Sequence, residues 1–232
     1  MSIRTEAEEN LRVIRSLMEK ATVYRAISAP AAAVGGILAL AGLFAFGNWA
    51  SGDHRNHPTD ISTAAFLGLW LGILVIAGVA NCVFLHRDAK RRNEQFVSAG
   101  MRWAVSALAP PFLVAGFFTL VALTAARPGT IVSVWTFCYG LALLATSHFA
   151  PKSLIRLGWT FLFAGFVSLS FLVYWDVAAL SGRLNDPGPA EARVRSVSIL
   201  GAQKWMALSF GAFHLIYAGC AWPRGARART DA

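Results

Sequence analysis

Residues 61–85 read ISTAAFLGLWLGILVIAGVANCVFL, and this stretch decides the fold class because it contains no charged side chain. A helix of about 20 residues is long enough to cross the hydrocarbon core of a bilayer, which is about 30 Å thick. The apolar residues do not alternate with polar ones, as they do in a transmembrane β-strand. Inside lipid, backbone groups must find hydrogen-bond partners within the segment. The sequence therefore predicts a membrane-spanning α-helix.

Five further stretches are equally free of charge. They cover residues 26–52, 103–126, 128–151, 157–175 and 205–223. Of the 232 residues, 56% are hydrophobic and 14% are charged, whereas a soluble domain has about 25% charged residues. We therefore expect an all-α, polytopic helical membrane protein with six transmembrane helices that form three hairpins, between residues 30 and 223.

The two ends of the chain are expected to be cytoplasmic segments. Residues 224–232 form a basic tail, and residues 1–29 carry apolar side chains at helical spacing. This pattern predicts an amphipathic helix over residues 5–28, which must bury its apolar stripe somewhere. Three alternatives are open: the stripe lies on the membrane surface, packs beneath the bundle, or docks against a protein partner.

The basic residues are distributed unequally between the two sides of the predicted bundle. Fifteen of the 21 lie in the N-terminal segment, the second and fourth connections and the tail, and six lie in the other connections. Because positive residues favour the cytoplasmic side, we expect both termini in the cytoplasm and the protein in a bacterial cytoplasmic (inner) membrane. The connection at 86–102 is expected to form a short helix that contacts anionic lipids of the inner leaflet. The basic residues form no single patch, so the net charge of +9 does not predict nucleic-acid binding.

Prolines and small residues set finer expectations for the spans. Proline is tolerated in the first turn of a helix, so the first span is expected to begin near Pro30 and the third to open at Pro110 and Pro111. The fifth span is expected over residues 157–180, followed by a long outer connection at 181–204. Small residues at every fourth position of the first span predict a close helix contact: Ala31, Gly35 and Ala39.

His214 is the candidate cofactor-binding residue because it lies near the centre of the sixth span. An ionisable group inside a membrane is costly and marks a potential functional site. Its neighbours on the same helix face are mostly aromatic: Phe210, Phe213 and Tyr217. Haem ligation, proton transfer and substrate contact are the functional alternatives. A neutral histidine bonded to a Ser, a Tyr or a backbone carbonyl is the interpretation that we favour, with no cofactor. Haem b needs a second axial histidine at matching depth, and His86 and His148 lie near the inner span ends.

The first outer connection contains nitrogen and oxygen groups that suit Zn or Cu(II): Asp53, His54, His57 and Asp60. The loop is short and contains Pro58, so a solvated polar loop is the interpretation that we favour, and the four residues are candidates only. The sequence contains no P-loop, no H-E-x-x-H, no G-x-S-x-G and no CxxC motif. We therefore predict no catalytic residue.

Three classes of function fit this sequence. The first is a non-enzymatic accessory, sensor or regulatory membrane protein, which the N-terminal helix and the nearly uncharged spans favour. The second is a transporter of small solutes or ions, which six spans and a weak repeat of three hairpins would suit. The third is a haem- or metal-binding redox subunit that uses His214.

Overall fold

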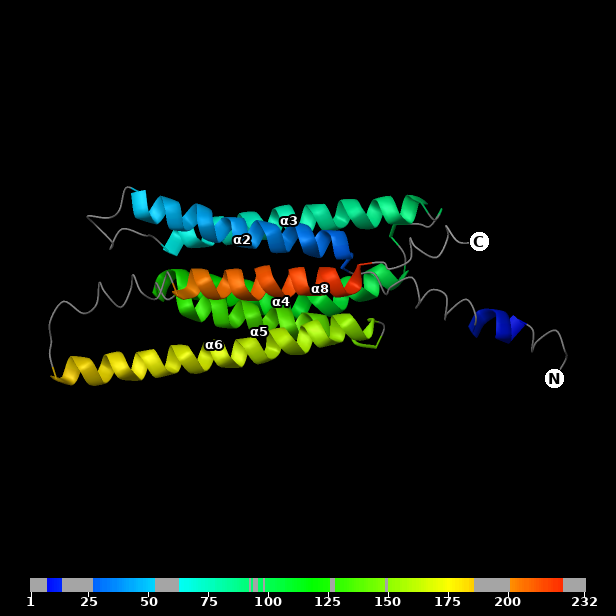
Figure 1. The fold of residues 1–232 in the computed structure, drawn as a ribbon. Helices are drawn as coiled ribbons and strands as arrows, with labels where there is room; N and C mark the ends of the chain where they lie inside the picture. Colours follow the sequence, from blue (N-terminus) through cyan, green and yellow to red (C-terminus); the bar gives the residue numbers. More distant parts are fainter. Residues whose placement is uncertain are drawn as a thin grey trace.

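The computed structural model of the chain is helical throughout the long segments that it describes (Figure 1). The described residues are 8–13, 27–52, 63–91, 93, 96–97, 99–125, 128–148, 150–185 and 201–222. For residues 47–52, 63, 99–100, 122–125, 128 and 175–185 the description extends to the backbone alone.

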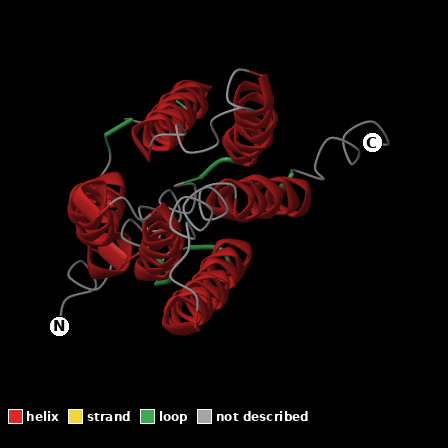
Figure 2. Ribbon diagram, turned by 90° about the vertical axis from the view of Figure 1, so that its left-hand side faces the viewer, coloured by secondary structure: helices red, strands yellow, loops and turns green. Residues whose placement is uncertain are grey.

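Five long helices follow one another along the chain. They are α2 (Ala29–Gly52), α3 (Thr63–Arg91), α4 (Ala99–Ala125), α5 (Pro128–Ala145) and α6 (Lys152–Asn185). A last helical run covers residues 201–221 and contains the π-helix η1 (Ala207–Ala212) and α8 (Phe213–Ala221). Successive helices run in opposite directions (Figure 1), and all lie along roughly one axis, with no strand in the described part (Figure 2).

Four of the described helices are long and apolar enough to cross a membrane. Their apolar segments are Ala29–Phe46, Ala64–Arg91, Met101–Val121 and Lys152–Tyr174. The apolar part of α5, Gly129–Ala145, is shorter, and η1 interrupts the last helical run. The expected all-α class is thus confirmed for the described residues, the four candidate spans are compatible with a multi-pass membrane protein, and the count of six spans stays a prediction.

The helix α4 contradicts one expectation. It begins at Ala99, so Pro110 and Pro111 lie well inside it rather than at its start. Each proline removes a backbone donor and leaves the carbonyl four residues earlier without its usual partner. Membrane helices tolerate this because neighbouring side chains and local adjustments satisfy the freed groups. The Ser106 hydroxyl donates to the carbonyl of Trp103 at 2.8 Å, in the turn before the prolines.

The inner connections also differ from expectation. The helix α3 continues to Arg91, and the described residues between it and α4 form turns and bends rather than a separate helix. Asn93 has a φ of 59°, the left-handed conformation in which asparagine often ends a helix. The helix α6 starts earlier than predicted because the carbonyl of Pro151 accepts the amides of Leu154 and Ile155 at 2.9 and 3.2 Å. With 34 residues, α6 is about 51 Å long.

The bundle has two halves joined by the last helical run. Close helix contacts pair α2 with α3, α4 with α5, and α5 with α6. The last helical run contacts α2 through both η1 and α8, and α8 also contacts α6. The helices α3 and α4 make at most marginal contact. The hairpin α2–α3 is therefore held to the other helices mainly through the last helical run, which lies between them (Figure 1).

Small residues set the closest approaches. The predicted stripe on α2 is confirmed as a contact surface: Ala31 and Ala39 are buried, and a Cβ added at Gly35 would lie 3.5 Å from Ala77 of α3. The closest approach of α2 to another helix backbone is one position further, where a Cβ on Gly36 would lie 2.9 Å from the carbonyl oxygen of Gly211. Glycine at such positions lets helix backbones meet directly.

A glycine of α5 offers a stability test of this packing. A Cβ on Gly140 would lie 2.7 Å from the backbone nitrogen of Leu162 and 2.9 Å from the carbonyl oxygen of Gly158, both on α6. Because backbone atoms cannot swing away, Gly140→Ala is expected to lower the free energy of unfolding by about 1–3 kcal/mol. Gly116→Ala on α4, which meets nothing within 4 Å, is the control and should raise it by about 0.5–1 kcal/mol. Denaturation in mixed micelles measures both, and equal effects would contradict the packing.

Candidate functional site

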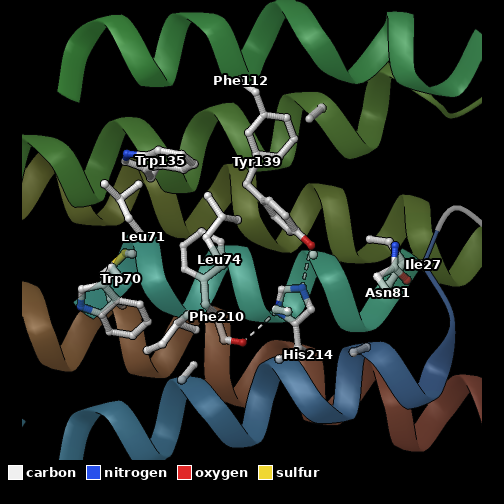
Figure 3. Close-up of a pocket in the computed structure, with 18 of the residues that line it drawn as sticks. Ile27, Trp70, Leu71, Leu74, Asn81, Phe112, Trp135, Tyr139, Phe210 and His214 are labelled. Atoms are coloured by element: carbon white, nitrogen blue, oxygen red, sulfur yellow. Dashed lines mark hydrogen bonds between the residues drawn. The ribbon is translucent and has the colours of Figure 1, made fainter. Parts of the chain in front are cut away.

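A cavity of about 270 Å³ lies within the bundle, where α3 and α4 face each other. Residues of α2, α3, α4, α5 and the last helical run line it (Figure 3). Many of the lining side chains are rings: Phe66, Trp70, Phe112, Trp135, Tyr139, Phe210 and His214. Leu71, Leu74 and Gly78 also line it, yet they are exposed on α3. The cavity therefore reaches the outer surface of the bundle along α3.

His214 points into this cavity from the last helical run and is 8% exposed. Its Nδ1 lies 2.8 Å from the carbonyl oxygen of Phe210, and its Nε2 lies 2.6 Å from the hydroxyl of Tyr139 (Figure 3). A carbonyl oxygen can only accept, so Nδ1 carries the proton and donates to Phe210. In a neutral imidazole Nε2 is then the acceptor, and Tyr139 donates to it. The favoured interpretation of a buried, hydrogen-bonded histidine is confirmed in its contacts.

Rings from three helices surround the histidine. Phe210 stacks on it with ring centroids 6.1 Å apart and planes inclined by 15°. Tyr139 of α5 and Phe161 of α6 approach it at centroid distances of 5.3 and 5.4 Å. The sequence predicted aromatic neighbours only on the histidine's own helix, because contacts between helices leave no local pattern. Tyr217, one of those neighbours, instead donates its hydroxyl to the carbonyl of Ile27 at 3.3 Å.

The other histidines do not share this environment. His86 lies exposed near the end of α3 with its ring edge against Phe96, and His148 is exposed in the turn after α5. Both ring nitrogens of His214 are already engaged, so a metal or haem iron would have to displace the hydroxyl of Tyr139. This geometry favours a hydrogen-bonding role over an axial-ligand role for His214.

The candidate metal ligands of the first outer connection lie outside the described residues: Asp53, His54, His57 and Asp60. The proposed site there stays a prediction. Within the part of the chain that the structure describes, no three His, Cys, Asp or Glu side chains are grouped in a way that could hold a metal ion.

Gln203 is a buried polar residue beside the cavity-lining Trp70 that the sequence does not reveal. The sequence places it in the last outer connection, but it lies in a helix and is 1% exposed. Its Oε1 accepts the indole N–H of Trp70 at 2.8 Å, and its Nε2 donates to the carbonyl of Gly42 at 3.2 Å. The available signal was Trp70 itself, since a tryptophan deep in an apolar span needs an acceptor for its N–H.

Serine and threonine hydroxyls complete the buried hydrogen bonds. The hydroxyls of Ser133 and Ser168 join α5 to α6 at 2.8 Å, the inter-helix bonding typical of serines in membrane helices. Trp135 of α5 donates to the hydroxyl of Thr119 on α4 at 2.8 Å. Ser209 donates to the carbonyl of Trp205 in its own helix at 2.8 Å.

This site has the character of a binding cavity. Its walls are mostly rings and aliphatic side chains, and its polar groups include Tyr139 and His214, which are hydrogen-bonded to each other, the indole of Trp70, which is bonded to Gln203, and the side chain of Asn81. Comparison with protein-family models, with curated proteins and with solved structures finds no match to this chain. Function therefore has to be inferred from the site itself.

The Tyr139–His214 hydrogen bond can be tested by a double-mutant cycle. Tyr139→Phe and His214→Phe each leave a buried polar group without its partner, so each should lower the free energy of unfolding by about 1–3 kcal/mol. The double variant should lose about 1 kcal/mol less than the sum of the single losses. Thr160→Val, at an exposed site on α6, should change stability by less than about 0.5 kcal/mol. Strict additivity would contradict the hydrogen bond.

Proposed function

We propose that this chain is a non-enzymatic protein of the cytoplasmic (inner) membrane with six spans and both termini in the cytoplasm, and that it acts as a sensor or accessory protein. One observation carries the proposal. The buried polar side chains of the described bundle include no Asp, Glu, Lys or Arg, and each has a hydrogen-bond partner: Thr119, Ser133, Thr136, Thr146, Gln203, Ser209 and His214.

This interior suits binding and signalling better than chemistry or ion transport. Proton-coupled and ion-coupled transporters use intramembrane charges or unsatisfied backbone groups at the binding site. A network in which most members are hydrogen-bonded specifies one packed arrangement instead, although the buried indole N–H of Trp205 has no hydrogen-bond partner. The bundle then serves as a scaffold that can report on what occupies its cavity.

The distribution of charge supports the proposed orientation. Basic side chains collect at the end of the bundle where α3 ends and α4 and α6 begin (Figure 1): Arg87, Lys90, Arg91, Arg102, Lys152 and Arg156. Cationic side chains at this end would contact anionic lipids of the inner leaflet. Under the positive-inside rule, this end of the bundle is the cytoplasmic one.

The N-terminal segment supports an accessory role. Within the described turn at residues 8–13, Leu11 is 65% exposed and Val13 is 50% exposed. This turn lies away from the bundle (Figure 1), and the rest of the expected stripe lies outside the described residues. Of the three uses for the apolar stripe, we propose contact with a protein partner.

A transporter is the second candidate because of α4. Prolines inside a membrane helix are a feature of broken helices at transport sites, and Pro110 and Pro111 both lie inside α4. The lack of buried Asp, Glu, Lys and Arg side chains in the described bundle argues against this candidate, and uptake assays in a deletion strain would decide it.

The topology can be mapped with single cysteines in a background where Cys82, Cys138 and Cys220 are replaced by alanine. One new cysteine is placed in each connection or tail: at His57, Asn93, Arg127, His148, Arg193 and Arg229. A membrane-impermeant maleimide should label the first, third and fifth sites in intact cells, and the others only after permeabilisation. If two consecutive sites are labelled from the same side, the span predicted between them does not cross the membrane. If the labelled and protected sites are exchanged throughout, the proposed orientation is wrong.

The accessory role predicts a partner that depends on the apolar stripe. Cells are cross-linked, and the full chain is purified in mild detergent. The variant Leu11→Asp with Leu17→Asp should lose a partner that the wild type captures, because a charge interrupts the stripe. The opposite-face variant Arg12→Gln with Arg15→Gln is the matched control and should keep it. Failure of the wild type to capture any partner would contradict the accessory role and favour transport.

A further inference from the structure

The cavity beside α3 is large enough to hold a molecule. Its volume of about 270 Å³ exceeds the roughly 150 Å³ of an apolar cavity that takes up benzene. It reaches the surface of the bundle at Leu71, Leu74 and Gly78, within a helix apolar enough to span a membrane. A molecule dissolved in the bilayer can therefore enter from the side, without crossing water.

The lining selects a neutral, ring-shaped ligand. Among the residues that the structure describes, no Asp, Glu, Lys or Arg lines the cavity, so a charged ligand would be desolvated without a counter-ion from these walls. Phe112 packs against Trp135 and against Tyr139 at centroid distances of 6.1 and 6.2 Å in tilted and edge-on geometry. Such a wall offers ring faces and edges, and aromatic rings gain from offset or edge-to-face contacts with it.

The hydrogen bonds of the site select a ligand that donates. Tyr139 gives its proton to His214, and His214 gives its own to the carbonyl of Phe210. Neither of these two donors is left for a ligand, and the side chain of Asn81 is a further polar group on the cavity wall. The phenolic oxygen of Tyr139 still has a lone pair, and a hydroxyl group inside the membrane needs such an acceptor. Donation to Tyr139 would also extend a chain of hydrogen bonds that polarise one another.

We propose that this cavity binds a lipophilic ring compound with a hydroxyl group, of the phenol or quinol class, with its ring among the aromatic walls and its hydroxyl donating to Tyr139. The inference rests on the proposed function, because it names the class of molecule that this membrane sensor detects. The ligand is bound from the bilayer through the opening along α3, and no covalent or redox step is involved.

The full chain in lipid nanodiscs tests the site by photo-labelling. The probe is para-hexylphenol with a diazirine in its alkyl chain, and labelled peptides are identified by mass spectrometry. The label should concentrate in the peptides of α3 and α5 that line the cavity. Unlabelled para-hexylphenol should compete about tenfold better than para-hexylanisole, which has the same shape but no donor.

Two glycines of α3 provide a matched pair for the cavity itself. An added Cβ meets nothing within 4 Å at either Gly78 or Gly72, but only Gly78 lines the cavity. Gly78→Phe should fill the opening and reduce labelling at least about tenfold, because the ligand loses its volume. Gly72→Phe should leave labelling unchanged.

The hydroxyl is tested by the double variant Tyr139→Phe with His214→Phe, since either group alone could still accept from the ligand. Labelling should persist, while the preference for the phenol over the anisole should fall to about one. Uniform labelling of lipid-facing peptides, or equal competition by the two compounds in the wild type, would overturn the site. If specific labelling is absent but the wild type still captures its partner, only the proposed ligand is refuted. If no partner is captured but specific labelling remains, only the accessory role is refuted.

Discussion

Hydrogen bonds from the last helical run hold the two halves of the bundle together. At one end of the run, Gln203 accepts from Trp70 of α3 and donates to Gly42 of α2. Eleven residues later, His214 accepts from Tyr139 of α5. Helices in lipid gain little from the hydrophobic effect, so packing and such bonds supply their association. Because α3 and α4 make at most marginal contact, the hairpin α2–α3 depends on these bonds and on the close approach of Gly36 to Gly211.

The π-helix between these two bonds explains how one run can serve both halves. In an unbroken α-helix, eleven residues make about three turns, so Gln203 and His214 would lie on the same face. The wider turn of η1 lies between them and rotates the second residue away from the first. Gln203 can therefore meet α2 and α3 while His214 meets α5. Such π segments often occur at functional sites, and here the segment also places the carbonyl of Phe210 where His214 donates to it.

The parts of this structure that follow a local rule could be predicted from the sequence, and the parts set by other helices could not. A long stretch without charged residues predicts a helix such as α3, and the expected burial of His214 predicts that its ring nitrogens form hydrogen bonds. The proline rule failed at α4 because a helix between other helices can continue through prolines such as Pro110 and Pro111, whose cost neighbouring groups and local adjustments reduce. Gln203 was assigned to a loop because its partners, Trp70 and Gly42, lie far away in sequence. The π-helix and the cavity have no sequence signal, since both arise from how whole helices meet.

The cavity follows from the same constraint that joins the halves. In water, an apolar space between α3 and α4 would favour collapse, because exposed apolar surface is costly. In a bilayer that cost is absent, since lipid chains are as apolar as the helices. The helices can then stay apart where small residues such as Ala77 and Gly78 face the gap, provided that a lipid chain or a ligand fills it. A lipid chain offers no donor to Tyr139, whereas a hydroxylated ring does. The hydrogen-bonded pair Tyr139 and His214 is therefore what distinguishes one occupant from the other.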